Sequence, residues 1–130
     1  MKLVVDTNVL VRFFVEDDPE QAAQAADALK AAESIVLSPL VLCELTWVLR
    51  RRYEASNDDI ISAIRGLLES DGIETNRPAA ESGLRMLENG GDFADGVILY
   101  EAQQARTDAL VTFDRRFAGR DWSGTVRLLD

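Results

Sequence analysis

Short apolar runs alternate with longer amphipathic stretches along the whole chain, and this alternation restricts the fold more than any other feature. The apolar runs predict strands at residues 3–5, 35–37, 73–75, 109–112 and 126–129. Helical spacing predicts helices at residues 7–15, 21–32, 40–53, 58–69, 79–88 and 93–106, with a helical turn at 114–117. Strands that alternate with helices predict an α/β fold with a mainly parallel sheet.

The chain has the size of one domain. At 130 residues it is long enough to close a single hydrophobic core. It contains no linker, repeat or low-complexity tract that would divide it. We therefore expect one domain over residues 1–130.

Polar residues ahead of the helical stretches predict where the helices begin. Asp18 followed by Pro19 is a good helix start, because an acidic N-cap precedes a proline at the first helical position. Asn57 or Asp58 is expected to cap the helix that ends near residue 69. Asp92 is expected to cap the helix that begins at residue 93.

Two absences limit the chemistry. The chain has no histidine and a single cysteine, Cys43. A zinc site of the usual kind is therefore not expected, and the missing imidazole excludes Ser-His-Asp hydrolysis and histidine-based RNA cleavage. One cysteine cannot form an intrachain disulfide, so a reducing cytoplasm fits best.

The first residues carry no signal-peptide pattern, and no apolar run is long enough for a membrane helix.

The charge of the chain is strongly acidic. A net charge of −9 argues against a protein that coats nucleic acid by electrostatics, but it allows an enzyme that meets RNA at one metal-filled site. Arginines are grouped at residues 50–52 and at Arg115, Arg116 and Arg120. The sequence supports two interpretations of these arginines equally. They are either solvated residues at helix ends or contacts to phosphate groups, for which Arg115 and Arg116 are candidates.

Two acids directly follow predicted strands. Asp6 follows the first apolar run, and Asp114 follows the run that ends near Thr112. In open parallel sheets, ligand sites lie beyond the carboxyl ends of the strands. These two carboxylates are therefore well placed for a shared site.

Two further acids lie at helical spacing from apolar residues. Glu44 has Leu40 and Val48 four residues away on either side, and Asp95 has Leu99 four residues ahead. Positions with this spacing share one helix face, so both acids are expected to point inward. An unpaired carboxylate in such a setting is costly unless it is protonated, paired or given a metal.

The four acids together predict a cation site. Oxygen ligands alone favour Mg²⁺, for which Mn²⁺ can substitute. Asn8 and Thr112 are candidate supporting residues that would orient the acids by hydrogen bonds, although either is equally an ordinary turn or strand residue.

Each acid also has an ordinary structural explanation. Asp6 and Asp114 would cap the helical stretches that follow them, and Asp95 would interact with the dipole at the start of its helix. For Glu44 the alternative is a buried salt bridge to an arginine. One shared cation site nevertheless explains the positions of all four acids better than four independent structural roles do.

The segments around these acids resemble the ordered motifs of PIN domains, specifically the VapC-type toxins of bacterial toxin–antitoxin pairs. They are residues 4–10 (VVDTNVL), 38–45 (SPLVLCEL), 92–98 (DFADGVI) and 111–117 (VTFDRRF). The resemblance extends over essentially the whole chain. Its main departure is Gly96, where alanine is more usual; glycine is expected to loosen the helix start slightly.

The resemblance implies a three-layer α/β/α fold, endoribonuclease activity and a homodimer. It also implies a cognate antitoxin protein whose tail lies in the active-site groove, and the net charge of −9 fits a basic inhibitory peptide.

The mechanism that we expect is in-line attack by metal-activated water on an RNA phosphodiester. Asp6 and Asp95 would be the principal metal ligands, Glu44 a ligand or base, and Asp114 a ligand through water. Since no histidine is present to deprotonate a 2′-hydroxyl, the expected products carry 3′-hydroxyl and 5′-phosphate ends.

Other classes of protein fit the sequence less well. A signalling receiver domain would need an aspartate after a middle strand and a late lysine, and residues 35–38 supply no such aspartate. A phosphatase with an aspartate nucleophile usually has Asp-x-Asp, whereas residues 6–8 are Asp-Thr-Asn. A protein-binding fold with idle acids remains an alternative that metal titration would test.

Overall fold

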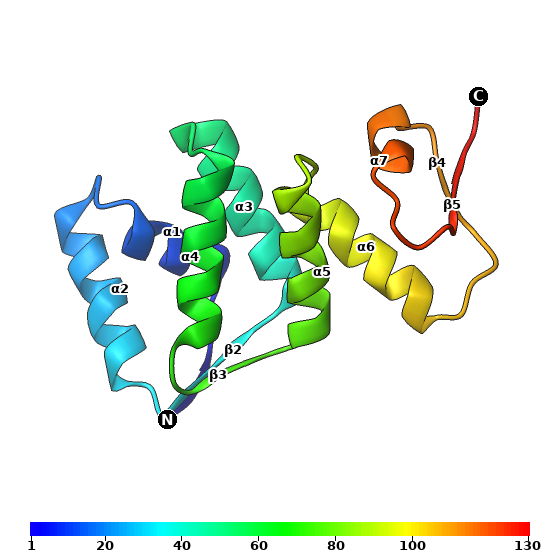
Figure 1. Ribbon diagram of the computed structural model, residues 1–130. Helices are drawn as coiled ribbons and strands as arrows, with labels where there is room; N and C mark the ends of the chain where they lie inside the picture. Colours follow the sequence, from blue (N-terminus) through cyan, green and yellow to red (C-terminus); the bar gives the residue numbers. More distant parts are fainter. The chain divides into compact units, whose positions relative to one another are not determined.

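The computed structural model describes all residues from Met1 to Asp130 and contains seven helices and five strands. The chain forms two compact units, Met1–Asn76 and Arg77–Asp130, and each is described by itself (Figure 1). The strands pair in parallel in both units, so the predicted α/β class is confirmed. The single domain over residues 1–130 stays a prediction.

The first unit is built on a three-stranded parallel sheet in the order β1-β2-β3. Its strands are β1 (Lys2–Val4), β2 (Ser34–Leu37) and β3 (Ile73–Thr75), and Ile35 of β2 pairs with both Leu3 and Ile73. Its helices are α1 (Thr7–Phe14), α2 (Pro19–Ala31), α3 (Pro39–Tyr53) and α4 (Asn57–Glu69). The most deeply buried side chains of this unit are leucines and isoleucines: Leu10, Leu37, Leu42, Leu45, Ile60 and Ile64.

Helix starts in this unit follow the expected chemistry, with one correction. Asp18 caps α2 by accepting a hydrogen bond from the Gln21 amide at 3.1 Å, as predicted. The cap of α4 is Ser56, whose hydroxyl accepts from the Asp59 amide at 3.1 Å, and not Asn57 or Asp58. Residues 56–59 are Ser, Asn, Asp and Asp, and all four side chains favour the N-cap position. The local sequence therefore does not choose among them, whereas the burial of Ile60 and Ile64 sets where the helix lies.

The second unit combines helices with a two-stranded parallel sheet. It contains α5 (Arg77–Glu88), α6 (Phe93–Gln104), β4 (Leu110–Thr112), α7 (Arg115–Gly119) and β5 (Val126–Leu128). β4 pairs with β5, with Leu110 opposite Val126. Met86, Leu99 and Phe117 form a buried cluster, and Leu110, Trp122 and Val126 pack against it.

A few predicted boundaries and environments differ from the structure. Helix α5 begins at Arg77, two residues earlier than expected, and α6 ends at Gln104 instead of Arg106, because Arg106 adopts a left-handed backbone with φ 55°. The first strand is less buried than predicted, since Val4 is 74% exposed on β1, an edge strand of its sheet. None of the helices combines the length and apolar character that a membrane crossing requires.

Candidate functional site

Asp6 lies between the carboxyl end of β1 and the start of α1. Its backbone is extended, with φ −79° and ψ 156°, and its Oδ1 accepts a hydrogen bond from the Thr7 amide at 2.7 Å. The predicted capping role is therefore confirmed. A carboxylate has two oxygens with about four lone-pair sites, so this bond leaves Oδ2 available. Capping and metal binding by Asp6 are compatible.

Glu44 projects from the middle of α3 and does not point into the core. Its side chain is exposed, as are Leu40 and Trp47 on the same helix face. The inward orientation expected for Glu44 is wrong, because the buried face of α3 carries Leu42, Leu45, Thr46 and Leu49 instead. No salt bridge involves Glu44, so the alternative of a buried ion pair is also wrong.

Asp6 and Glu44 line one cavity of about 250 Å³ in the first unit. We call it the Asp6–Glu44 cavity; its other lining residues are Thr7, Asn8, Val11, Arg12, Val48, Arg52 and Tyr53. The hydroxyl oxygen of Thr7 is buried and has no hydrogen-bond partner. Asn8, predicted as a supporting residue, and Arg52, one of the grouped arginines, line the same cavity as both acids, whereas Arg12 and Tyr53 were not singled out from the sequence.

In the second unit, Asp95 stands in the first turn of α6 and is partly buried. Burial, together with the negative charges of Asp92 and Asp114, raises the pKa of Asp95 to about 6, while Arg120 acts in the opposite direction. The negative charge of Asp114 therefore acts on Asp95, which it disfavours as a carboxylate.

Asp114 caps α7 at the end of β4. Its Oδ1 accepts hydrogen bonds from the amides of Arg116 and Phe117 at 2.9 and 3.0 Å. The Thr112 hydroxyl accepts a hydrogen bond from the Asp114 amide at 3.0 Å, which fixes the backbone that carries the acid. The predicted cap is confirmed, and Thr112 does bond to the residue that it was expected to support.

Asp92 differs from its expected role. It occupies the N-cap position of α6, but its side chain makes no capping hydrogen bond. Its charge instead contributes to the raised pKa of Asp95. Arg115 and Arg116 are exposed at the start of α7, whereas Arg120 donates from Nε to the Asn89 carbonyl at 3.0 Å.

The donor chemistry of both units fits a hard divalent cation. The first unit supplies Asp6 and Glu44 in one cavity, and the second supplies Asp95 and Asp114, the latter of which raises the pKa of Asp95. Neither unit alone arranges three or more acidic, histidine or cysteine side chains to hold a metal ion. All these side chains offer oxygen atoms, which Mg²⁺ and Mn²⁺ prefer as ligands. The unpaired Thr7 hydroxyl in the Asp6–Glu44 cavity is a further oxygen next to Asp6.

Acids just beyond the carboxyl ends of parallel strands are the arrangement of a ligand site in an α/β protein, and the family model of the PIN domain matches residues 3–122. The chain belongs to the PIN domain family, as the motifs around its four acids predicted. Among curated proteins, Ribonuclease VapC26 of Mycobacterium tuberculosis is 28% identical over 120 residues, which cover 88% of this chain and 87% of the relative.

Proposed function

We propose that this chain is a metal-dependent endoribonuclease that acts as the toxin of a toxin–antitoxin pair. The observation that carries the proposal is the presence of all four acids in a chain that the PIN model matches from residue 3 to residue 122. A relative that is named a ribonuclease and is similar over nearly its whole length supports the same activity.

In this proposal Asp6, Glu44, Asp95 and Asp114 serve one catalytic site. Asp6 and Asp95 are the principal ligands of Mg²⁺ or Mn²⁺, Glu44 is a ligand or base, and Asp114 acts through water. A bound divalent cation supplies activation of water and neutralisation of charge at the phosphate.

The chain's other residues orient these groups and the substrate. The capping bonds of Asp6 and Asp114 hold each carboxylate in place through Oδ1 and leave Oδ2 for the cation. Asn8 and Thr112 support the acids, and Arg115 and Arg116 are candidate contacts to RNA phosphates.

The proposed partners are RNA, a cognate antitoxin protein and a second copy of the chain in a homodimer, with the cytoplasm as the compartment. An acidic chain of net charge −9 suits a basic inhibitory segment of the antitoxin.

The test is to incubate the purified chain with RNA and Mg²⁺ and to sequence the RNA ends. We expect 3′-hydroxyl and 5′-phosphate ends, since the chain has no histidine to activate a 2′-hydroxyl. Asp6→Asn and Glu44→Gln should each reduce cleavage at least about 100-fold, because a direct ligand should matter no less than the residues that orient ligands. Asn caps helices as well as Asp, so Asp6→Asn should keep its fold.

The matched control is Asp58→Asn, an exposed aspartate in the first turn of α4. It should cleave like the unmodified chain. Ends with 2′,3′-cyclic phosphate from the pure protein would contradict the mechanism. No cleavage with Mg²⁺ or Mn²⁺, together with no response to metal titration, would favour a non-catalytic protein-binding domain.

A further inference from the structure

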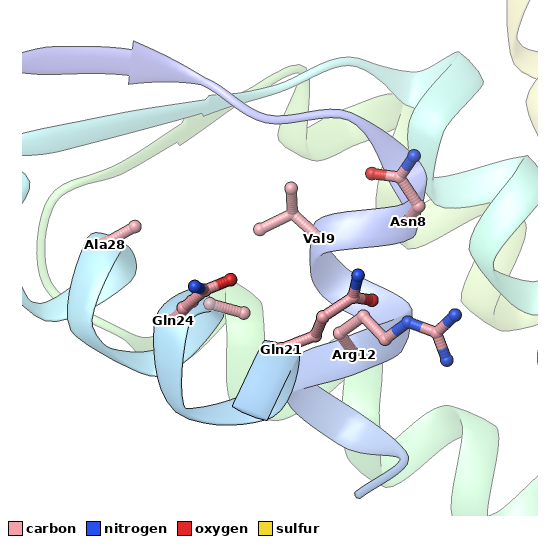
Figure 2. Close-up of a pocket in the computed structure, with 7 residues that line it drawn as sticks. Asn8, Val9, Arg12, Gln21, Gln24 and Ala28 are labelled. Carbon is pink, nitrogen blue, oxygen red and sulfur yellow. The ribbon is translucent and has the colours of Figure 1, made fainter. Parts of the chain in front are cut away.

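A second cavity, of about 460 Å³, lies between α1 and α2 in the first unit, and we call it the α1–α2 groove. It is lined by Asn8, Val9 and Arg12 of α1 and by Gln21, Gln24, Ala25 and Ala28 of α2 (Figure 2). Its volume falls within the ~300–1,000 Å³ that is typical of sites for small organic groups.

The α1–α2 groove adjoins the Asp6–Glu44 cavity. Asn8 and Arg12 line both cavities, so one turn of α1 forms their common wall. A ligand that extends from one cavity to the other would pass these two side chains. A polymer whose phosphate lies at Asp6 and Glu44 could therefore place a neighbouring unit in the groove.

The polar groups of the groove match the hydrogen-bonding edge of a nucleobase. Gln21 and Gln24 project from α2, with the Gln21 amide directed toward α1 (Figure 2). The side-chain amides of Asn8, Gln21 and Gln24 make no hydrogen bond within the chain. Each offers both donors and an acceptor, as base edges do. Val9, Ala25 and Ala28 are small apolar residues that leave room for a flat ring.

The groove offers one guanidinium, that of Arg12, to a phosphate. Its lining contains one cation, Arg12, and no acid, although the chain as a whole carries a net charge of −9. Arg12 forms an ion pair with Asp17, in which one terminal nitrogen donates to Asp17 Oδ1 at 3.1 Å. Since a guanidinium has five N–H donors, this bond leaves donors for a phosphate.

Asp17 also fixes the place of Arg12. Its Oδ2 accepts a hydrogen bond from the Tyr53 hydroxyl at 3.1 Å, so Asp17 is bonded to both α1 and the end of α3. A guanidinium held in this way loses less freedom when it binds a phosphate.

We propose that the α1–α2 groove is a subsite for one nucleotide of single-stranded RNA next to the cleaved bond. Arg12 binds its phosphate, and Gln21, Gln24 and Asn8 bind the edge of its base. Asp17 and Tyr53 are positioning residues for Arg12. This inference rests on the proposed function. It adds the location of the residues that determine which base is preferred beside the cleaved bond.

The test compares the double variant Gln21→Ala/Gln24→Ala with Gln103→Ala/Gln104→Ala, which removes two exposed glutamines of α6 outside both cavities. Cleavage positions are sequenced on an RNA pool with randomised positions, and KM and kcat are measured on one preferred oligonucleotide. Loss of the amide contacts should raise KM about tenfold, with a smaller change in kcat. The base preference at one position beside the cut should disappear. The control should match the unmodified chain.

Binding is measured separately, by fluorescence anisotropy of labelled RNA oligonucleotides with Asp6→Asn protein, so that cleavage is not needed. Adding Gln21→Ala/Gln24→Ala should weaken the binding of the preferred sequence, and adding Arg12→Gln should weaken the binding of every sequence and reduce its salt dependence. Adding Tyr53→Phe should have a smaller effect in the same direction.

If the unmodified chain cleaves RNA but the glutamine variants keep its KM and base preference, the subsite is wrong and the proposed function stands. If no RNA is cleaved but oligonucleotide binding depends on Gln21 and Gln24, RNA binding in the groove stands and the nuclease proposal fails.

Discussion

At the scale of single residues, Asp6 and Asp114 show that two interpretations of an acid need not exclude each other. Each caps a helix through Oδ1, as its local sequence predicted. In each case the capping bonds orient the carboxylate and leave Oδ2 for another partner. Asp95 differs, because the structure provides burial and like charges around it in place of hydrogen bonds.

The raised pKa of Asp95 predicts a pH-dependent stability. A carboxyl whose pKa rises from 3.8 to about 6 on folding binds its proton more tightly in the folded state, so its ionisation destabilises the fold. This loss of stability is absent at a pH below the Asp95 pKa of the unfolded chain, 3.8. It grows as the pH rises from 3.8 to about 6, and it is complete above the Asp95 pKa of the folded chain. Asp95→Asn should therefore stabilise the metal-free chain at pH 7 by about 1 kcal/mol, a figure reduced for solvent screening.

Urea unfolding in EDTA from pH 3 to pH 8 measures this effect. The difference between Asp95→Asn and the unmodified chain should vanish near pH 3. A constant difference across the range would show that the ionisation of Asp95 is not its cause. Asp58→Asn is the control, because it removes an exposed charge elsewhere.

At the scale of elements, the contact between α5 and α6 depends on glycine. A Cβ at Gly96 would lie 2.2 Å from the Ser82 carbonyl oxygen, and one at Gly83 would lie 2.5 Å from the Phe93 ring. The Ser82 hydroxyl also donates to the Gly96 carbonyl at 2.6 Å. The expectation that Gly96 merely loosens the helix start is therefore wrong, since it permits the close approach of the helix that carries Asp95.

Gly96→Ala tests this packing. Alanine favours helices over glycine, but here its methyl group meets backbone atoms that cannot move independently, so we expect destabilisation by about 1–3 kcal/mol. The matched control is Gly66→Ala on α4, where a Cβ meets nothing within 4 Å. That change should stabilise by roughly 0.5–1 kcal/mol. Thermal unfolding followed by circular dichroism measures both; stabilisation by both substitutions would contradict the packing argument.

At the scale of the whole molecule, each compact unit carries two of the four acids, and the PIN model matches sequence from both units. If the four serve one cation, Mg²⁺ binds the folded chain only. The free energy of unfolding should then rise by about 2.7 kcal/mol when the free ion is at 100 times its dissociation constant. At this chain length the midpoint of thermal unfolding should increase by roughly 3–5 °C per kcal/mol.

Differential scanning calorimetry with and without millimolar Mg²⁺ measures this increase. Asp6→Asn in the first unit and Asp114→Asn in the second should each reduce it, whereas Asp58→Asn should not. A response that depends on the acids of only one unit would contradict a site shared by all four.

The sequence alone determined the order and type of the elements, because apolar periodicity and capping residues act over a few neighbours. It also identified the family and its four acids, since each motif is a short contiguous segment. Only the tertiary structure decided which face of α3 is buried, how closely α5 and α6 approach at Gly96, and that Asp17 bonds to both Arg12 and Tyr53 beside the α1–α2 groove. Those features depend on residues far apart in the chain, and local patterns carry no information about which distant side chains will meet.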